Sequence, residues 1–211
     1  MKYYQEIEIL PQTEINAYHI LTHVVSGIHN RIVVNDTGDI GISFPDYQYN
    51  ESNNKGSLGR KIRVFAPTEE KLINLRLLDE LSKISDYIDI NDIDEVGDKA
   101  TRYEVYTRVH TKNLEKEALR LQKHLNAKRG ASEQLTYDEV LINCIKWRKK
   151  IPNHLFIYLK SNSNKHGYQA HIKREVLNAP TGNLYFNTFG LSSGDSKKLS
   201  SVPSWLSLIH I

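Results

Sequence analysis

Cysteine is nearly absent from this sequence, because Cys144 is the only one among 211 residues. A single cysteine excludes a disulfide within the chain, and chains without disulfides are typical of reducing compartments, so we expect a cytoplasmic protein. No apolar run approaches the roughly 20 residues that a membrane-spanning helix needs. The first ten residues, MKYYQEIEIL, carry acids where a secretory signal would have its apolar centre. These absences predict a globular chain without a membrane or secretory segment.

Several well-known catalytic motifs are also missing. The sequence has no GxSxG elbow, no Walker A loop, no GxGxxG fingerprint and no HxE with CxxC, which argues against serine hydrolases, P-loop enzymes, dinucleotide-binding enzymes and zinc deaminases. His19 and His23 have the i, i+4 spacing of a metal pair, but no HExxH acid accompanies them. We therefore predict neither a metal nor a cofactor.

Basic residues are few in the first half of the chain, and acidic residues are few in the second. Residues 1–98 contain 9 Lys and Arg against 17 Asp and Glu, a net charge of −8, whereas residues 99–211 contain 19 against 8, a net charge of +11. The net charge of the whole chain, +3, conceals this division. A basic half suggests contact with a polyanion such as nucleic acid, although basic residues also cluster by chance on solvated faces.

The first half alternates strands and helices. The predicted order is β-α-β-β-α-β, at residues 3–9, 13–34, 40–44, 61–66, 68–84 and 87–96, with a polar loop at 46–59. This order is that of a ferredoxin-like domain, which RRM modules share. The predicted fold class is therefore α+β, with a ferredoxin-like (RRM-like) domain over residues 1–98.

The second half is predicted to form a basic α+β domain over residues 99–211. Its expected elements are a strand at 101–111, helices at 113–129 and 136–150, and strands at 155–160, 169–174 and 185–189, followed by a loop-like tail. The strand at 101–111 would present Arg108 and His110 at the entrance to the first helix. The sequence assigns no role to residues 129–150.

Two features of this pattern allow more than one interpretation. The helix at 113–129 has a basic stripe and an apolar stripe, formed respectively by Lys116, Arg120, Lys123 and His124 and by Leu114, Ala118, Leu121 and Leu125. The basic stripe is either a solvated face or a rod that lies against phosphates. His29 is next to the apolar stripe of the first helix, and is either a packing histidine or a residue that transfers protons.

Six short segments, read in order, resemble one known family. They are His29 followed eleven residues later by the strand Ile40-Gly-Ile-Ser-Phe-Pro, then Ser57-Leu-Gly59, Thr107-Arg-Val-His110 with the basic helix after it, Ser161-Asn-Ser163, Tyr168, and Phe189-Gly-Leu-Ser192. In this order they resemble the endoribonucleases that mature the precursor RNA of type I-F CRISPR systems. The resemblance covers nearly the whole chain.

The resemblance implies a reaction and a role for each matching residue. His29 would act as the base on a ribose 2′-hydroxyl, which Ser161 would hold in place. Arg108 would read a guanine at the base of an RNA hairpin, and Tyr168 would stack on the terminal base pair. The remaining RNA-binding positions would be His110, Lys116, Arg120, Lys123, His124 and Ser163.

Such a reaction needs no metal, because RNA carries its own nucleophile. The expected products are a 2′,3′-cyclic phosphate and a 5′-hydroxyl. The resemblance also implies that the protein retains the product hairpin within a guide-RNA complex that has backbone, large and small subunits. Phe189 replaces a tyrosine of the family beside His29, and it lacks the hydroxyl needed for a hydrogen bond. Two alternatives remain: a subunit that binds the hairpin without cutting it, and a general RRM-like regulator, whose RNP aromatics are missing from the central strands.

Overall fold

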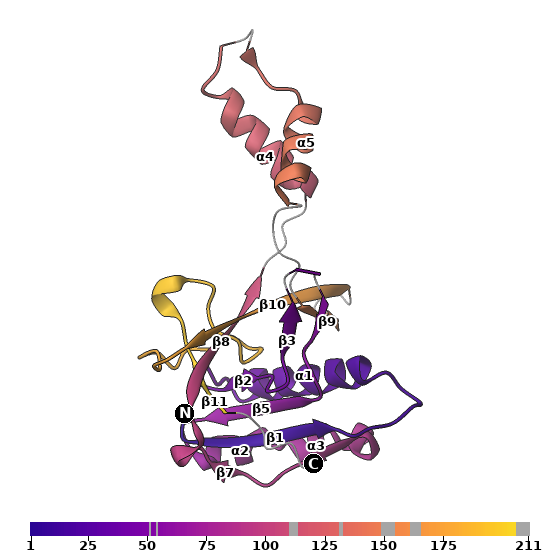
Figure 1. Ribbon diagram of the computed structural model, residues 1–211, viewed down its shortest axis with the longest axis vertical. Helices are drawn as coiled ribbons and strands as arrows, with labels where there is room; N and C mark the ends of the chain where they lie inside the picture. The colour runs from indigo at the N-terminus through magenta and orange to yellow at the C-terminus, as the bar shows by residue number, and fades with distance from the viewer. Residues whose placement is uncertain are drawn as a thin grey trace. The chain divides into compact units, whose positions relative to one another are not determined.

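The structure is a computed structural model that describes residues 1–50, 52–53, 55–109, 114–130, 133–148, 155–160 and 166–205. The chain divides into two compact units (Figure 1). Unit 1 consists of Met1–Asn50, Lys55–Val109 and His154–Ile211, and unit 2 of Glu51–Asn54 and His110–Asn153.

The first sheet of unit 1 follows the predicted order of elements. Its strands are β1 (Tyr3–Ile9), β2 (Gly41–Ser43), β5 (Lys61–Ala66) and β6 (Ile88–Ile90), in the spatial order β2-β5-β1-β6, and β7 (Asp94–Glu95) also pairs with β1. All of these pairings are antiparallel. Thus β1 and β5, which the sequence predicted with the same bounds, form the centre of the sheet.

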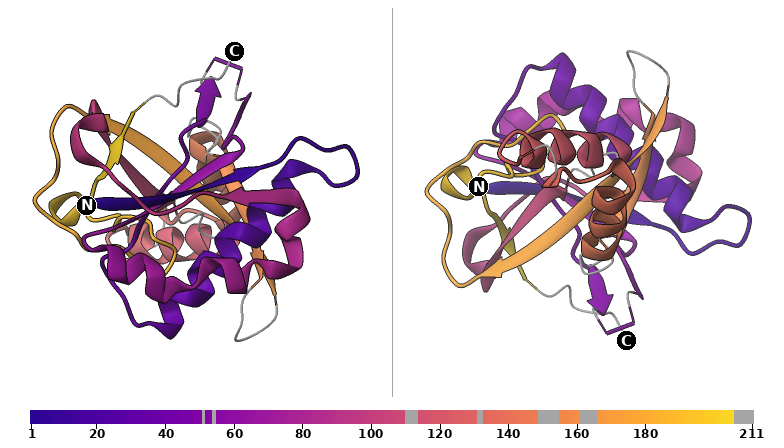
Figure 2. Two further views of the ribbon diagram at one scale, coloured as in Figure 1. Left: turned by 90° about the horizontal axis from the view of Figure 1, so that it is seen from below. Right: turned by 90° about the horizontal axis from the view of Figure 1, so that it is seen from above.

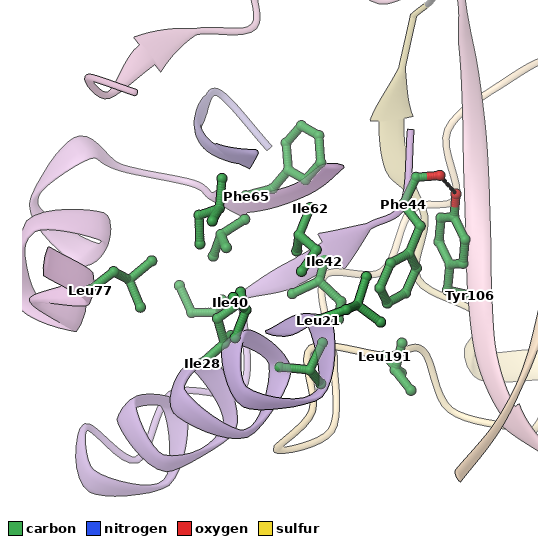
Figure 3. Close-up of a cluster of buried hydrophobic side chains, with 14 of the residues drawn as sticks. Leu21, Ile28, Ile40, Ile42, Phe44, Ile62, Phe65, Leu77, Tyr106 and Leu191 are labelled. Atoms are coloured by element: carbon green, nitrogen blue, oxygen red, sulfur yellow. Dashed lines mark hydrogen bonds between the residues drawn. The ribbon is translucent and has the colours of Figure 1, made fainter. Parts of the chain in front are cut away.

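Two helical segments cover one face of this sheet. Helix α1 (Ala17–Val34) begins four residues later than predicted, because the side chain of Asn16 caps it by accepting a hydrogen bond from the backbone N–H of Tyr18. Helices α2 (Glu69–Leu75) and α3 (Leu77–Glu80) contact α1, and both helical segments lie on the same side of β1 (Figure 2). Leu21 and Ile28 of α1 face the apolar side chains of the sheet (Figure 3).

The structure corrects three predictions in this half. The strand predicted at 87–96 is divided into β6 and β7, which pair separately with β1. The single helix predicted at 68–84 is interrupted at Arg76, whose φ of 48° is left-handed, and it continues as α3 and the 3₁₀ helix η1 (Ser82–Tyr87). The predicted loop at 46–59 contains a hairpin of β3 (Gln48–Asn50) and β4 (Lys55–Ser57). Both strands are short and largely exposed, so they lack the alternation of apolar residues that marks a strand.

A second sheet in unit 1 is built from the other half of the chain. Its spatial order is β11 (Val202–Ser204), β8 (Arg102–Val109), β10 (Gly167–Leu177) and β9 (Leu155–Lys160). Its inner residues, such as Tyr106, Ile157 and Ile172, belong to the same buried cluster as Ile7 and Ile28. The compact units therefore do not follow the predicted division at residue 98, because both halves of the sequence contribute to one core.

The C-terminal region also differs from its prediction. Residues 185–189, predicted as a strand, form a turn with an isolated bridge between Phe186 and Ser192. The predicted loop-like tail instead contains the 3₁₀ helix η4 (Ser196–Lys198) and β11, which pairs with β8. Trp205 follows β11, and the Arg63 guanidinium lies 4.0 Å from its ring centre while donating a hydrogen bond to Glu6 at 2.5 Å. The tail thus completes the unit.

Unit 2 contains two helices, α4 (Leu114–Asn126) and α5 (Tyr137–Arg148), which pack against each other. Their small core is formed by Ala118, Val140 and Cys144. Over the described part of the chain, no helix is both long and apolar enough to cross a bilayer.

Candidate active site

Four residues that the sequence singled out lie together in unit 1. They are His29 of α1, Arg108 of β8, Tyr168 of β10 and Phe189 of the turn after residue 186, and we call them the His29 cluster. The His29 and Phe189 rings are stacked, with centres 4.0 Å apart and planes 8° apart. The Arg108 guanidinium lies 4.8 Å from the centre of the Tyr168 ring and 5.8 Å from that of Phe189. All four side chains are half-buried, so a ligand can reach them.

A tight turn holds Phe189 against His29. The side-chain oxygen of Asn187 accepts hydrogen bonds from the backbone N–H groups of Phe189 and Leu191, at 2.8 and 3.2 Å. Gly190 has a φ of +68°, and a Cβ there would lie 2.7 Å from Ile42 Cγ2. This position therefore needs glycine for both its conformation and its close approach to β2.

Segments of the site that are distant in sequence are joined by backbone hydrogen bonds. The N–H of Ile42, in the IGISFP strand, donates to the carbonyl of Gly190 at 2.9 Å. The N–H of Ser192 donates to the carbonyl of Tyr106 at 2.8 Å. The segment Phe189–Ser192 thus connects β2, which follows α1, with β8, which carries Arg108.

A backbone carbonyl fixes the proton of the His29 ring. His29 Nδ1 lies 2.7 Å from the carbonyl oxygen of Thr188. A carbonyl can only accept, so Nδ1 carries the proton and donates it, and in the neutral ring Nε2 keeps its lone pair. The neutral imidazole is therefore arranged to accept a proton at Nε2. Sequence reasoning missed Thr188, because it contributes only a carbonyl that every residue has, although Asn-x-x-Gly at 187–190 is a turn signal.

A buried carboxylate, that of Glu104, lies in the same strand as Arg108. The Glu104 side chain is 1% exposed, and its carboxylate lies 3.4 Å from Arg102 Nη2 and 3.6 Å from Arg174 Nη1. The Tyr106 hydroxyl donates to this carboxylate at 2.6 Å and also lies 3.1 Å from the carbonyl of Phe44 (Figure 3). Burial, and then the Glu104 carboxylate, raise the pKa of Tyr106 well above its usual value, so its hydroxyl stays protonated.

Three of the predicted site residues lie outside the described residues. These are Ser161, Ser163 and His110. Ser161 follows Lys160 in sequence, and Lys160 is paired with Gly167, the neighbour of Tyr168. The roles predicted for the three residues stay predictions.

The basic stripe predicted for residues 113–129 belongs to unit 2. Lys116, Arg120, Lys123 and His124 are all exposed on α4, as a surface that binds phosphates would require. Of the predicted apolar stripe, Ala118 is fully buried, whereas Leu121 remains 38% exposed. A cavity of about 640 Å³ opens between α4 and α5, and its lining includes Arg120, His124 and Trp147.

The described residues offer no ready metal site. No group of three or more His, Cys, Asp or Glu side chains in the described ranges is placed to hold an ion. His19 and His23 are both exposed on α1.

Comparison with known proteins identifies the family. The family model described as CRISPR-associated protein (Cas_Csy4) matches residues 4–205. The chain belongs to the Cas_Csy4 family. This confirms the family that the six short segments predicted. The CRISPR-associated endonuclease Cas6/Csy4 of Pseudomonas aeruginosa (strain UCBPP-PA14) is 24% identical over 201 residues, which cover 92% of this chain and 97% of that protein.

Two solved structures show weaker similarity to this Cas_Csy4 family member. One is a CRISPR endoribonuclease Cse3 bound to a 19-nt RNA, at 12% identity and a TM-score of 0.30, with 96% of this chain and 99% of that chain covered. The other is a CRISPR-associated protein Cas6, at 11% identity and a TM-score of 0.34, with 96% and 98% covered. At these TM-scores neither structure supports a detailed comparison.

Proposed function

We propose that the chain is an endoribonuclease that cleaves CRISPR precursor RNA at the base of a repeat hairpin and then retains the hairpin. The observation that carries this proposal is the tautomer of the His29 imidazole in a member of the Cas_Csy4 family. Its Nδ1 donates a hydrogen bond to the Thr188 carbonyl, so Nε2 is available to accept a proton. The strand order of the first sheet supports a ferredoxin-like domain as the platform for this site.

The proposed reaction uses the ribose 2′-hydroxyl as its nucleophile. His29 Nε2 takes the hydroxyl proton while the 2′-oxygen attacks the phosphorus, and the bond from phosphorus to the 5′-oxygen breaks. The leaving oxygen gains a proton from the imidazolium or from solvent. The products are a 2′,3′-cyclic phosphate and a 5′-hydroxyl, and no step needs a metal-bound water. Ser161 is proposed to orient the 2′-hydroxyl, and alignment of this kind contributes roughly 7–11 kcal/mol in favourable cases.

The half-buried cation of the cluster is proposed to read the RNA. The Arg108 guanidinium can donate two parallel hydrogen bonds to a guanine edge. Its contact with the Tyr168 ring supports this role by restricting the orientation of the guanidinium plane. Tyr168 would stack on the last base pair, and the basic residues of α4 would neutralise phosphates. Retention of the hairpin would make the protein a subunit of a cytoplasmic complex with backbone, large and small subunits.

A cleavage experiment with matched substrates tests the proposal. A repeat hairpin should be cut in the presence of EDTA, and a single 2′-deoxy substitution at the cut site should abolish cutting. His29→Ala should abolish cutting but keep hairpin binding, whereas His23→Ala, an exposed histidine on the same helix, should behave as the wild type.

Two outcomes would contradict it in different ways. Cutting of the 2′-deoxy RNA would exclude the 2′-hydroxyl as the nucleophile. Tight hairpin binding without any cutting by the wild-type chain would favour the alternative of a non-catalytic hairpin-binding subunit.

A further inference from the structure

The outer face of the second sheet carries aromatic rings that the proposed reaction does not use. In β9, Ile157 and Leu159 are buried at 1% and 3% exposure, whereas Phe156 and Tyr158 are 36% and 53% exposed. Because successive side chains of a strand point to opposite faces, both rings lie on the face directed away from the core.

The neighbouring strand β10 extends this face with polar and aromatic groups. His171 is the register partner of Phe156, and their ring centres are 5.5 Å apart. Gln169 is the partner of Tyr158. Tyr18 of α1 contacts Phe156 edge-on at 6.1 Å, which holds that ring in place. We call Phe156, Tyr158, Gln169 and His171 the ring face.

A glycine allows the Tyr158 ring to lie across the sheet. A Cβ on Gly167 would be 2.1 Å from Tyr158 Oη and 2.5 Å from its Cζ, so the outer end of the ring occupies the space above this glycine. Any other residue would displace the ring. One side of the ring therefore rests on the sheet while the other faces solvent, which is the arrangement of a stacking platform.

We propose that the ring face stacks bases of the single-stranded RNA that continues from the base of the hairpin. This inference rests on the proposed function. RRM modules bind single strands through aromatic rings on adjacent strands of a sheet, as Phe156 and His171 are placed here. On the first sheet Phe65, the register partner of Tyr4, is fully buried. Phe156 and Tyr158 of the second sheet are instead exposed.

The position of the ring face favours RNA over a protein partner. Strands β9 and β10 carry the ring face on one side, and β10 carries Tyr168 of the His29 cluster near its start, where Lys160 pairs with Gly167. By strand alternation Tyr168 lies on the opposite face of β10 from Gln169. An RNA strand that leaves the hairpin at Tyr168 therefore reaches the ring face around the end of the sheet where Lys160 pairs with Gly167. The rings alternate with Gln169 and His171 rather than forming a continuous apolar patch, and polar groups beside rings suit bases.

A binding experiment with four RNAs tests this inference. The probes are the bare hairpin, the hairpin with a single-stranded extension at its 5′ or 3′ side, and oligouridine alone, all with 2′-deoxy at the cut site where one exists. Tyr158→Ala and Phe156→Ala should each weaken binding of an extended hairpin and of oligouridine by roughly 5- to 150-fold. Both should leave binding of the bare hairpin unchanged. Tyr158→Phe should keep full affinity, and Tyr185→Ala, a tyrosine 79% exposed in a loop of the same unit, is the matched control.

Each other outcome overturns the inference. If Tyr158→Ala and Phe156→Ala bind every RNA with the affinity of the wild type, the rings do not contact RNA, and a protein partner becomes the better explanation of their exposure. An equal loss for bare and extended hairpins would mean that the substitutions disturb the sheet. Failure of the proposed function is distinguished separately: the wild-type chain would then not cleave the unmodified repeat RNA that contains the cut site, whereas oligouridine binding still reports on the rings.

Discussion

At the scale of single residues, the state of His29 depends on groups that contribute no charge. The Thr188 carbonyl fixes which nitrogen carries the proton, and the Phe189 ring covers one face of the imidazole. A tyrosine at position 189 could add a hydrogen bond, but stacking with ring centres 4.0 Å apart does not require a hydroxyl. Orientation of His29 thus rests on ring contact and one backbone bond.

Substitution of Phe189 should separate orientation from binding. Phe189→Ala removes the stacked ring, and we expect single-turnover cleavage to slow by roughly 10- to 100-fold, because small misplacements of reacting groups have effects of this size. Phe189→Tyr should cleave as the wild type. Cleavage rates at saturating enzyme measure both variants, and hairpin affinity measured in parallel should change far less. An unchanged rate for Phe189→Ala would show that Thr188 alone orients His29.

The buried Tyr106 hydroxyl should matter for stability. Tyr106→Phe removes a donor from Glu104, which stays buried, so we expect the free energy of unfolding to fall by about 1–3 kcal/mol. Tyr103→Phe is the matched control, since the hydroxyl of this half-exposed tyrosine of the same strand makes no hydrogen bond to another described residue. Urea denaturation followed by circular dichroism measures the difference. Equal midpoints for the two variants would contradict the prediction.

The side chains of the candidate site could be predicted from sequence motifs, whereas the backbone groups that hold them could not. His29, Arg108, Tyr168 and Phe189 were found because a motif requires those residue types in that order, and the structure brings them together. The buried state of Glu104 and Tyr106 was not predicted, since an alternating strand with polar residues on one face usually exposes that face. Here that face meets the shared core.

At the scale of elements, α5 has a well-defined start. The Thr136 backbone N–H and hydroxyl donate to the Glu139 carboxylate at 2.8 and 2.9 Å, and the Glu139 N–H donates back to the Thr136 hydroxyl at 3.3 Å. This is a capping box. The hydrogen bonds from Thr136, the backbone one first, lower the pKa of Glu139.

Removal of this cap should loosen unit 2 selectively. Thr136→Ala should destabilise α5 by about 1 kcal/mol, and Thr136→Ser should retain the cap. Because Glu139 has a lowered pKa in the folded state, its contribution is present above its unfolded pKa and is lost as pH falls through the folded one. Amide hydrogen exchange in α5 at neutral and acidic pH measures the effect. Faster exchange in α1 as well would mean that the effect is not local.

The elements themselves were predicted best where apolar periodicity is strong. Strands β1 and β5 have their predicted bounds, because their apolar residues build the centre of the sheet. The break at Arg76 was not predicted, since no glycine or proline marks this left-handed residue. Strand β11 was missed because it is three residues long and contains Pro203, which suits an edge strand.

At the scale of the whole molecule, charge is distributed along the sequence differently from the compact units. Unit 1 includes the acidic half and much of the basic half, whereas the 110–153 segment has 10 Lys and Arg against 5 Asp and Glu. This segment is inserted in the sequence between β8 and β9, which belong to the same sheet. Its basic residues are therefore a local feature of unit 2.

Salt dependence should reveal which of these charges meet phosphates. Arg120→Gln and Lys123→Gln should each reduce the slope of log K against log salt for hairpin binding by about 0.7–0.9, the value for one lost phosphate contact. Lys83→Gln, an exposed lysine in the acidic half, should leave the slope unchanged. Filter binding between low and moderate salt measures the slopes. If all variants have the same slope as the wild type, the basic stripe of α4 faces solvent and does not contact phosphates.

The three-part construction of unit 1 has a consequence for how the protein is made. Strand β11 and Trp205 complete the second sheet and cover Arg63, so unit 1 cannot close during translation until residue 205 has left the ribosome. The helices of unit 2 are adjacent in sequence and can pair earlier. Nascent chains stalled before residue 202 should therefore expose an incomplete second sheet to chaperones and proteases, although its other three strands are already synthesised.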